Sequence, residues 1–143
     1  MREALAGRAA GLGDLMTPGQ LFVYAIVTSG ADIYAGGNFY NAGGLAKADH
    51  VAKWDGNNWS ALGSNLLNDG AINNFVYAMA IQGNDLYVGG NFYDAAGIDE
   101  ADLIAHWDGS QWLAMGSNGL GDGALNGTVR SIAISGNKVY AGG

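Results

Sequence analysis

Residues 34–39 read YAGGNF, residues 87–92 read YVGGNF, and residues 140–143 read YAGG. The tyrosines that open these segments, Tyr34, Tyr87 and Tyr140, are 53 residues apart (87 − 34 = 53 and 140 − 87 = 53). Residues 23–75 align with residues 76–128 without a gap, and 29 of the 53 positions are identical. The chain is therefore built from a 53-residue repeat, and residues 129–143 begin another copy of it.

Each repeat contains four short apolar segments that are typical of β-strands and are separated by turn residues. In the first repeat they are VYAIVTS, IYAGGNF, VAKW and WSAL, at residues 23–29, 33–39, 51–54 and 59–62. The dipeptide Asp-Gly at 55–56, which returns at 108–109, favours a hairpin between the third and fourth segments. We therefore predict four antiparallel strands per repeat.

The first two strands are apolar on both sides, whereas a sheet with one wet face would alternate. Four-stranded sheets that stack face to face around an axis cover both sides of such strands, so we predict an all-β protein of the β-propeller class. The predicted units are blade 1 at 23–75, blade 2 at 76–128, and the first two strands of blade 3 at 129–143. Residues 1–22 are predicted to end a preceding repeat, as a fourth strand or as a short helix.

The segments LYVGGNF and LIAHWDGSQWLAMGS, at residues 86–92 and 103–117, resemble kelch-like propeller repeats. The likeness is closest to the variant found in bacterial cell-surface proteins and in fungal cortical polarity markers. Its pattern falls at Tyr34, Gly36, Gly37, Phe39, Ala42, Gly43, Gly44, Val51, Ala52, Trp54, Asp55, Gly56 and Trp59, and again at Tyr87, Gly89, Gly90, Phe92, Ala95, Ala96, Gly97, Ile104, Ala105, Trp107, Asp108, Gly109 and Trp112. The resemblance implies a propeller fold and a place outside the cell or at its surface. The double arginine of some kelch interaction modules is absent, so their partners are not carried over.

Propellers close with about four to eight blades, and this chain carries fewer. We therefore expect it either to be part of a longer propeller or to complete a ring by self-association. In the second case the last two strands of one copy join the N-terminal segment of the next. Two copies would then make a six-bladed ring, and three copies a larger one. Head-to-tail contacts that do not close produce filaments instead.

Composition excludes several classes of function. The chain carries 6 Lys and Arg against 13 Asp and Glu, for a net charge of −7, which disfavours nucleic-acid binding. It has no basic cluster for a membrane surface, and no apolar stretch of about 18 residues that would predict a membrane span. Cysteine is absent, which excludes disulfides, thiolate catalysis and Cys-ligated zinc. No segment has the features of a signal peptide.

The candidate binding residues lie in the longer connections, which an up-and-down blade places together on one face. Polar side chains recur there in both repeats, at Asn38 and Asn91, Asp49 and Asp102, Asn65 and Asn118, and Asp69 and Asp122. As a binding site they would suit a sugar, a peptide or a calcium ion. The alternative, which we favour, is that these Asn and Asp side chains cap turns by bonding their own backbone. No stretch has EF-hand spacing, and we predict no cofactor and no metal.

Trp59 and Trp112 allow two interpretations. Exposed, they would stack on sugar rings, and buried, they would fill the space between blades. Their repetition in register favours packing. His50 aligns with Leu103, and His106 aligns with Lys53, so neither histidine belongs to the repeated pattern. We interpret both as solvated strand residues and predict no catalytic site.

The sequence thus favours a non-catalytic propeller module for binding or assembly. Its expected partners are further copies of itself or further blades, with a protein or glycan as ligand, and neither nucleic acid nor membrane. One alternative is a structural subunit of a filament or surface layer. The other is a carbohydrate-binding propeller, such as a lectin or a glycosidase-like protein.

Overall fold

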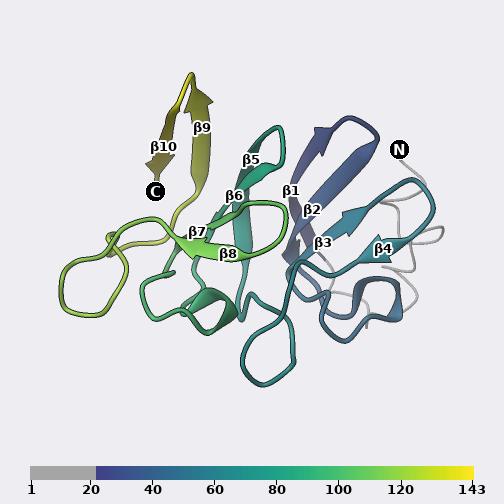
Figure 1. Cartoon of the computed structure of the whole chain (residues 1–143), viewed down its shortest axis with the longest axis horizontal. Coiled ribbons are helices and arrows are strands. Elements are labelled where there is room, and N and C mark those ends of the chain that lie inside the picture. The colour runs from purple at the N-terminus through teal and green to yellow at the C-terminus, as the bar shows by residue number, and fades with distance from the viewer. Residues whose placement is uncertain (1–21) are drawn as a thin grey trace.

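The structure is a computed structural model that describes residues 22–143, so the strand or helix predicted within residues 1–22 lies outside the described residues. The described part is all-β, with two four-stranded antiparallel sheets and a two-stranded hairpin (Figure 1). The prediction of repeated four-stranded antiparallel sheets is confirmed. These residues form no closed propeller.

The two sheets have the same strand order. Sheet 1 consists of β1 (Phe22–Ser29), β2 (Asp32–Asn38), β3 (Val51–Trp54) and β4 (Trp59–Ser60). Sheet 2 consists of β5 (Val76–Gln82), β6 (Asp85–Gly90), β7 (Ile104–Trp107) and β8 (Trp112–Ala114). The hairpin pairs β9 (Ser131–Ser135) with β10 (Lys138–Gly142), and single turns of 3-10 helix cover Ala42–Gly44 (η1) and Ala95–Gly97 (η2).

The fourth strand of sheet 1 is shorter than predicted: β4 ends at Ser60, whereas the predicted strand ended at residue 62. The backbone carbonyl of Leu62 serves another purpose: it accepts a hydrogen bond of 2.6 Å from the indole Nε1 of Trp112 in sheet 2. The end of the predicted strand is therefore part of the contact between the sheets.

A β-bulge in the first strand of each sheet sets which side chains share a face. The register shifts between Val23 and Ala25 in β1 and, 53 residues later, between Val76 and Ala78 in β5. A bulge inserts one unpaired residue, so side chains three apart come to the same side of the strand. Val76 and Met79 thereby both reach Gly36 of sheet 1.

Each unit has two different faces, which we name by their residues. The front face carries Val23, Ile26 and Trp59 in sheet 1, Val76, Met79 and Trp112 in sheet 2, and Val129 and Ile132 in the hairpin. The back face carries Tyr34, Gly36 and Leu62 in sheet 1, Tyr87, Gly89 and Met115 in sheet 2, and Tyr140 and Gly142 in the hairpin. The front face of sheet 2 packs on the back face of sheet 1, and their side chains form the main buried cluster.

Glycine at position 36 is what permits this close approach. A Cβ added there would collide with Met79 Sδ and would lie 2.5 Å from Val76 Cγ1. The same contact recurs one unit further on, where a Cβ added to Gly89 would collide with Val129 and lie 3.0 Å from Ile132 Cδ1. Sheet 2 is therefore covered on both faces, as its apolar strands require.

No helix within residues 22–143 is both long enough and apolar enough to cross a membrane.

Candidate functional site

The predicted binding residues lie on the long connections, which Figure 1 shows at the edge of the sheets opposite the β1–β2 and β5–β6 turns. We call this edge the loop edge and the opposite one the turn edge. The hydrogen bonds of the described residues show what most of the predicted side chains do there.

Asn65 and Asn118 hold their own loops. Asn65 Oδ1 accepts the backbone N–H groups of Leu67 (2.9 Å) and Asp69 (3.0 Å). Asn118 Oδ1 accepts those of Leu120 (2.7 Å) and Asp122 (3.3 Å). Such bonds fix an Asx-type turn. Both asparagine oxygens are therefore used within the loop.

Asp49 and Asp102 are buried and likewise serve the backbone. Asp49 Oδ1 accepts the N–H of Asn41 at 2.7 Å, and Asp102 Oδ1 accepts the N–H of Asp94 at 2.8 Å. Asn41 and Asp94 both adopt positive φ, at 54° and 50°. The two aspartates therefore stabilise a left-handed residue that opens each 3-10 turn.

Asp69, Asn38 and Asn91 are other predicted binding residues with a described environment. Burial raises the pKa of Asp49, the N–H of Asn41 opposes this, and the charge of Asp69 adds to the rise. Asn38 ends β2, and the Oδ1 atom of Asn91 is buried with no hydrogen-bond partner among the described residues. Among the described residues, the hydrogen bonds of the Asn65, Asn118, Asp49 and Asp102 side chains all stay within one repeat.

Exposed leucines that the sequence did not single out lie on the same edge. Leu67 and Leu120 are 86% and 87% exposed, at equivalent tips of the two loops that Asn65 and Asn118 hold. A hollow of about 180 Å³ lies beside the first tip and is lined by residues of both repeats, among them Leu67, Asn73 and Asp94. The signal was available, since leucine recurs at a spacing of 53 within loops that are otherwise polar.

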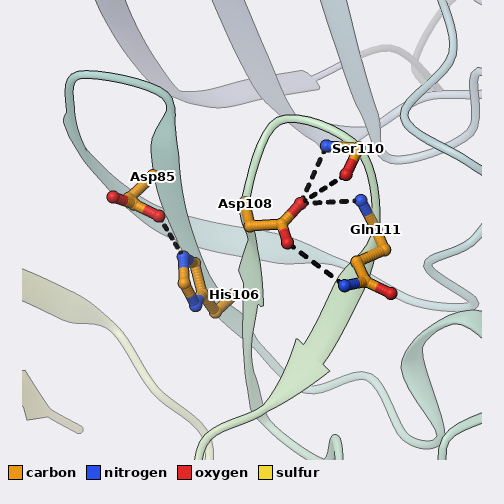
Figure 2. A network of polar contacts seen from close by, with 5 residues as sticks. All are labelled: Asp85, His106, Asp108, Ser110 and Gln111. Atoms are coloured by element: carbon orange, nitrogen blue, oxygen red, sulfur yellow. Dashed lines mark hydrogen bonds and ion pairs between the residues drawn. The ribbon is translucent and has the colours of Figure 1, made fainter.

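The interpretation of His106 as a solvated residue was wrong. Its Nε2 lies 2.7 Å from Asp85 Oδ1 (Figure 2). Its ring also stacks on that of Tyr87, with the ring centroids 4.6 Å apart. In sheet 1 the equivalent pair is Lys53 and Asp32, with Nζ and Oδ2 also 2.7 Å apart. His106 therefore does belong to the repeat, since its side chain contacts Asp85 as Lys53 contacts the equivalent Asp32.

The turn after His106 is held by Asp108. Its Oδ1 accepts the N–H groups of Ser110 (2.8 Å) and Gln111 (2.9 Å), and its Oδ2 accepts Gln111 Nε2 (Figure 2). The hydrogen bonds from Gln111 and Ser110 lower the pKa of Asp108 to about 2. Asp55 makes the same turn in sheet 1, so neither carboxylate is free to act as a general acid.

The interpretation of His50 was also wrong. Its side chain is buried beside Tyr40 and Phe75, and its Nδ1 lies 3.2 Å from the Gly37 carbonyl oxygen. It precedes β3 with φ 60°, as Leu103 precedes β7 with φ 65°. Burial lowers the pKa of His50, and the carbonyl of Gly37 opposes this. His50 is therefore a packing residue, and within residues 22–143 its ring bonds to a backbone carbonyl rather than to a carboxylate.

A groove of about 410 Å³ opens between the sheets at the turn edge. Asp32, Tyr34 and Lys53 of sheet 1 line it, together with Asn84, Trp107 and Asp108 of the second repeat. Amides, carboxylates and aromatic rings are the groups that bind sugars. Tyr34 and Trp107 are buried, however, and Asp32 and Asp108 already have partners. Among the described residues, Asn84 and Ser60 are polar groups of the groove whose side chains make no hydrogen bond.

The tryptophans of the fourth strands are buried, as the repetition predicted. Trp112 bonds to Leu62 across the contact between sheets, but the equivalent indole Nε1 of Trp59 is buried with no partner among residues 22–143. A hollow of about 410 Å³ lies beside Trp59 and is lined by Leu45, Ala46, Lys47, Ser60 and Ala61. Trp59 and Trp112 are thus buried to a similar degree, 8% and 5% exposed, but they differ in having a hydrogen-bond partner among the described residues.

No group of three or more His, Asp or Glu side chains in residues 22–143 is arranged to hold a metal ion. Searches against protein-family models and against curated proteins returned no match for the chain.

Proposed function

We propose that the protein is a non-catalytic module of the kelch-like β-propeller type, in which sheets 1 and 2 are neighbouring blades and the hairpin begins a third. One observation carries the proposal: the front face of one unit packs on the back face of the preceding unit, twice over. Val76 and Met79 fit over Gly36, and the equivalent Val129 and Ile132 fit over Gly89. A contact that repeats with the sequence is how a propeller grows.

The module acts in binding or assembly. Further blades complete its ring, either from other copies of this chain or from a longer chain. Its loop edge is the surface for a partner, because the loops there are fixed by their own Asn and Asp side chains and present Leu67 and Leu120 to solvent. Rigid loops with exposed apolar tips suit a protein partner. The resemblance to cell-surface repeats supports a location outside the cell or at its surface.

Negative-stain electron microscopy of the purified protein tests this proposal. Rings with separate blades, or fibres built from blades, are the expected particles. The proposal would be contradicted by isolated particles with no blade pattern, together with an unchanged free energy of unfolding in variants substituted at Gly36 or Met79 of the contact between sheets. Fibres in place of rings would favour the structural subunit of a filament or surface layer.

The groove at the turn edge favours carbohydrate binding as a second candidate, since Asn84 lines it together with Tyr34 and Trp107. A glycan array tests this candidate, and Asn84→Ala is the matching variant. A ligand whose binding is lost in Asn84→Ala would support it. A calcium titration followed by thermal shift tests the separate possibility that the loop-edge carboxylates hold a cation.

A further inference from the structure

We propose that copies of this chain associate head to tail, with the back face of the hairpin in one copy packed on the front face of sheet 1 in the next. This inference rests on the proposed function, because it takes the contact between sheets as a contact between blades. It goes further by committing to a second copy of the chain as the partner and by naming the residues that meet.

The chain already makes this contact twice. Val76 and Met79 on the front face of sheet 2 lie against Gly36 on the back face of sheet 1. Val129 and Ile132 on the front face of the hairpin lie against Gly89 on the back face of sheet 2. In each case two apolar side chains fill the space that a glycine leaves. The two side chains are three residues apart, Val76 and Met79 across the bulge in β5, and Val129 and Ile132 at the equivalent positions of the next unit.

The chain also carries both halves of a third such contact, and in this structure they do not meet. The front half is Val23 and Ile26 in β1, which stand 53 residues before Val76 and Met79. The back half is Tyr140 and Gly142 in β10, which stand 53 residues after Tyr87 and Gly89. A Cβ added to Gly142 would meet only Ser131 Oγ, which belongs to the hairpin itself.

Exposure differs between the occupied contacts and the two halves at one large side chain in each half. Met79 is 8% exposed, whereas its equivalent Ile26 is 46% exposed. Tyr34 is 6% exposed, whereas its equivalent Tyr140 is 55% exposed. An exposed apolar side chain at a position that the repeat covers elsewhere marks a candidate interaction surface. The occupied contacts show what covers it, namely a surface of the same design with the opposite face.

A second copy supplies that surface without any new feature. The contact is continuous with the two that exist, since it repeats the same step from one unit to the next. Because front and back faces differ, the interface is heterologous, and each copy keeps one free face for the next. Successive copies therefore extend the stack until it closes into a ring, or they continue as a fibre.

Cysteine cross-linking tests this contact directly, because the chain has no cysteine of its own. Two single variants are prepared, Ile26→Cys and Gly142→Cys, and each is oxidised alone and after mixing. We expect a disulfide-linked pair only in the mixture, since head-to-tail packing brings position 26 of one copy to position 142 of another. Non-reducing electrophoresis with mass spectrometry of the linked peptide reads the result.

The matched control is the double variant Gly36→Cys and Met79→Cys, which places cysteines at the equivalent positions of the contact within one chain. If this control forms its internal disulfide and the mixture forms none, the head-to-tail inference is overturned while the blade contact stands. If the control also fails to form, the contact between sheets is itself wrong, and the proposed function falls together with this inference. Linking within Ile26→Cys alone would indicate a symmetric contact and would also overturn it.

Discussion

At the scale of single residues, the two equivalent tryptophans differ by one hydrogen bond. Trp112 Nε1 donates to Leu62 O, whereas Trp59 Nε1 has no partner among the described residues. We expect Trp112→Phe to lower the free energy of unfolding by about 1–3 kcal/mol more than Trp59→Phe does, because the first change leaves a buried carbonyl unpaired. Urea unfolding of both variants measures the difference. Equal losses would show that the indole bond contributes nothing beyond packing.

His50 gives a second prediction at this scale. Burial lowers its pKa below the usual 6.5, so the unfolded chain binds the proton more readily. Stability is then complete above pH 6.5 and falls as the pH drops, by at most about 1.4 kcal/mol per pH unit until the pKa of the folded state is reached. His50→Leu, which copies Leu103 of the second repeat, removes this dependence. The test compares unfolding free energies at neutral and mildly acidic pH in both proteins, and parallel losses would contradict it.

The histidines also mark what the sequence left open at the residue scale. The burial of both tryptophans was predictable because they recur in register. His106 meets Asp85 across two strands, 21 residues away in sequence, and no local spacing announces that pair. His50 is buried by Tyr40 and Phe75, which reach it from different connections. Both contacts depend on how the strands and loops are placed in space.

At the scale of elements, substitutions of the glycines in the second strands distinguish a contact needed for folding from a contact between copies. Gly36→Ala forces a Cβ onto Met79 and Val76, and we expect it to cost about 1–3 kcal/mol of unfolding free energy, as overpacking does. Gly142→Ala meets only Ser131 Oγ, so its effect on unfolding should stay within about 0.5 kcal/mol. Chemical denaturation of dilute protein checks both. Similar losses at the two positions would mean that glycine is needed by the strand itself.

The loops supply another prediction at this scale. Asn118 Oδ1 accepts the N–H groups of Leu120 and Asp122, so Asn118→Ala should accelerate hydrogen exchange at those two amides and leave the β7 and β8 amides unchanged. Asn118→Asp retains the acceptor and is the matched control. If Asn118→Ala left the exchange at both amides unchanged, the asparagine would have a role other than holding the turn.

Most elements were predictable from the repeat, because turn residues separate the apolar runs at the same places in both copies. The bulge at Val23–Ala25 was not, since an unpaired residue leaves no mark on an apolar run such as VYAIVTS. Its consequence, two front-face side chains three residues apart, decides which face meets which. The predicted loop edge is where the long connections lie, but its Asn and Asp side chains mainly hold backbone, and the exposed leucines were overlooked.

At the scale of the whole molecule, the units within residues 22–143 all stack in the same orientation. Every unit offers a front face to the one before it and a back face to the one after it, and among residues 22–143 only sheet 2 has a neighbouring unit on each face. On the front face of sheet 1 Ile26 is 46% exposed, and on the back face of the hairpin Tyr140 is 55% exposed. Our account of assembly follows from this polarity, and it requires no ligand, metal or symmetric interface.

The most direct test is the mass of the protein in solution, measured by size-exclusion chromatography with light scattering over a range of micromolar concentrations. The account predicts species that are multiples of the 14.7 kDa chain, and it predicts that Ile26→Asp, which puts a charge on the front face, returns the protein to 14.7 kDa. A single 14.7 kDa species of the unsubstituted chain at every concentration would contradict it.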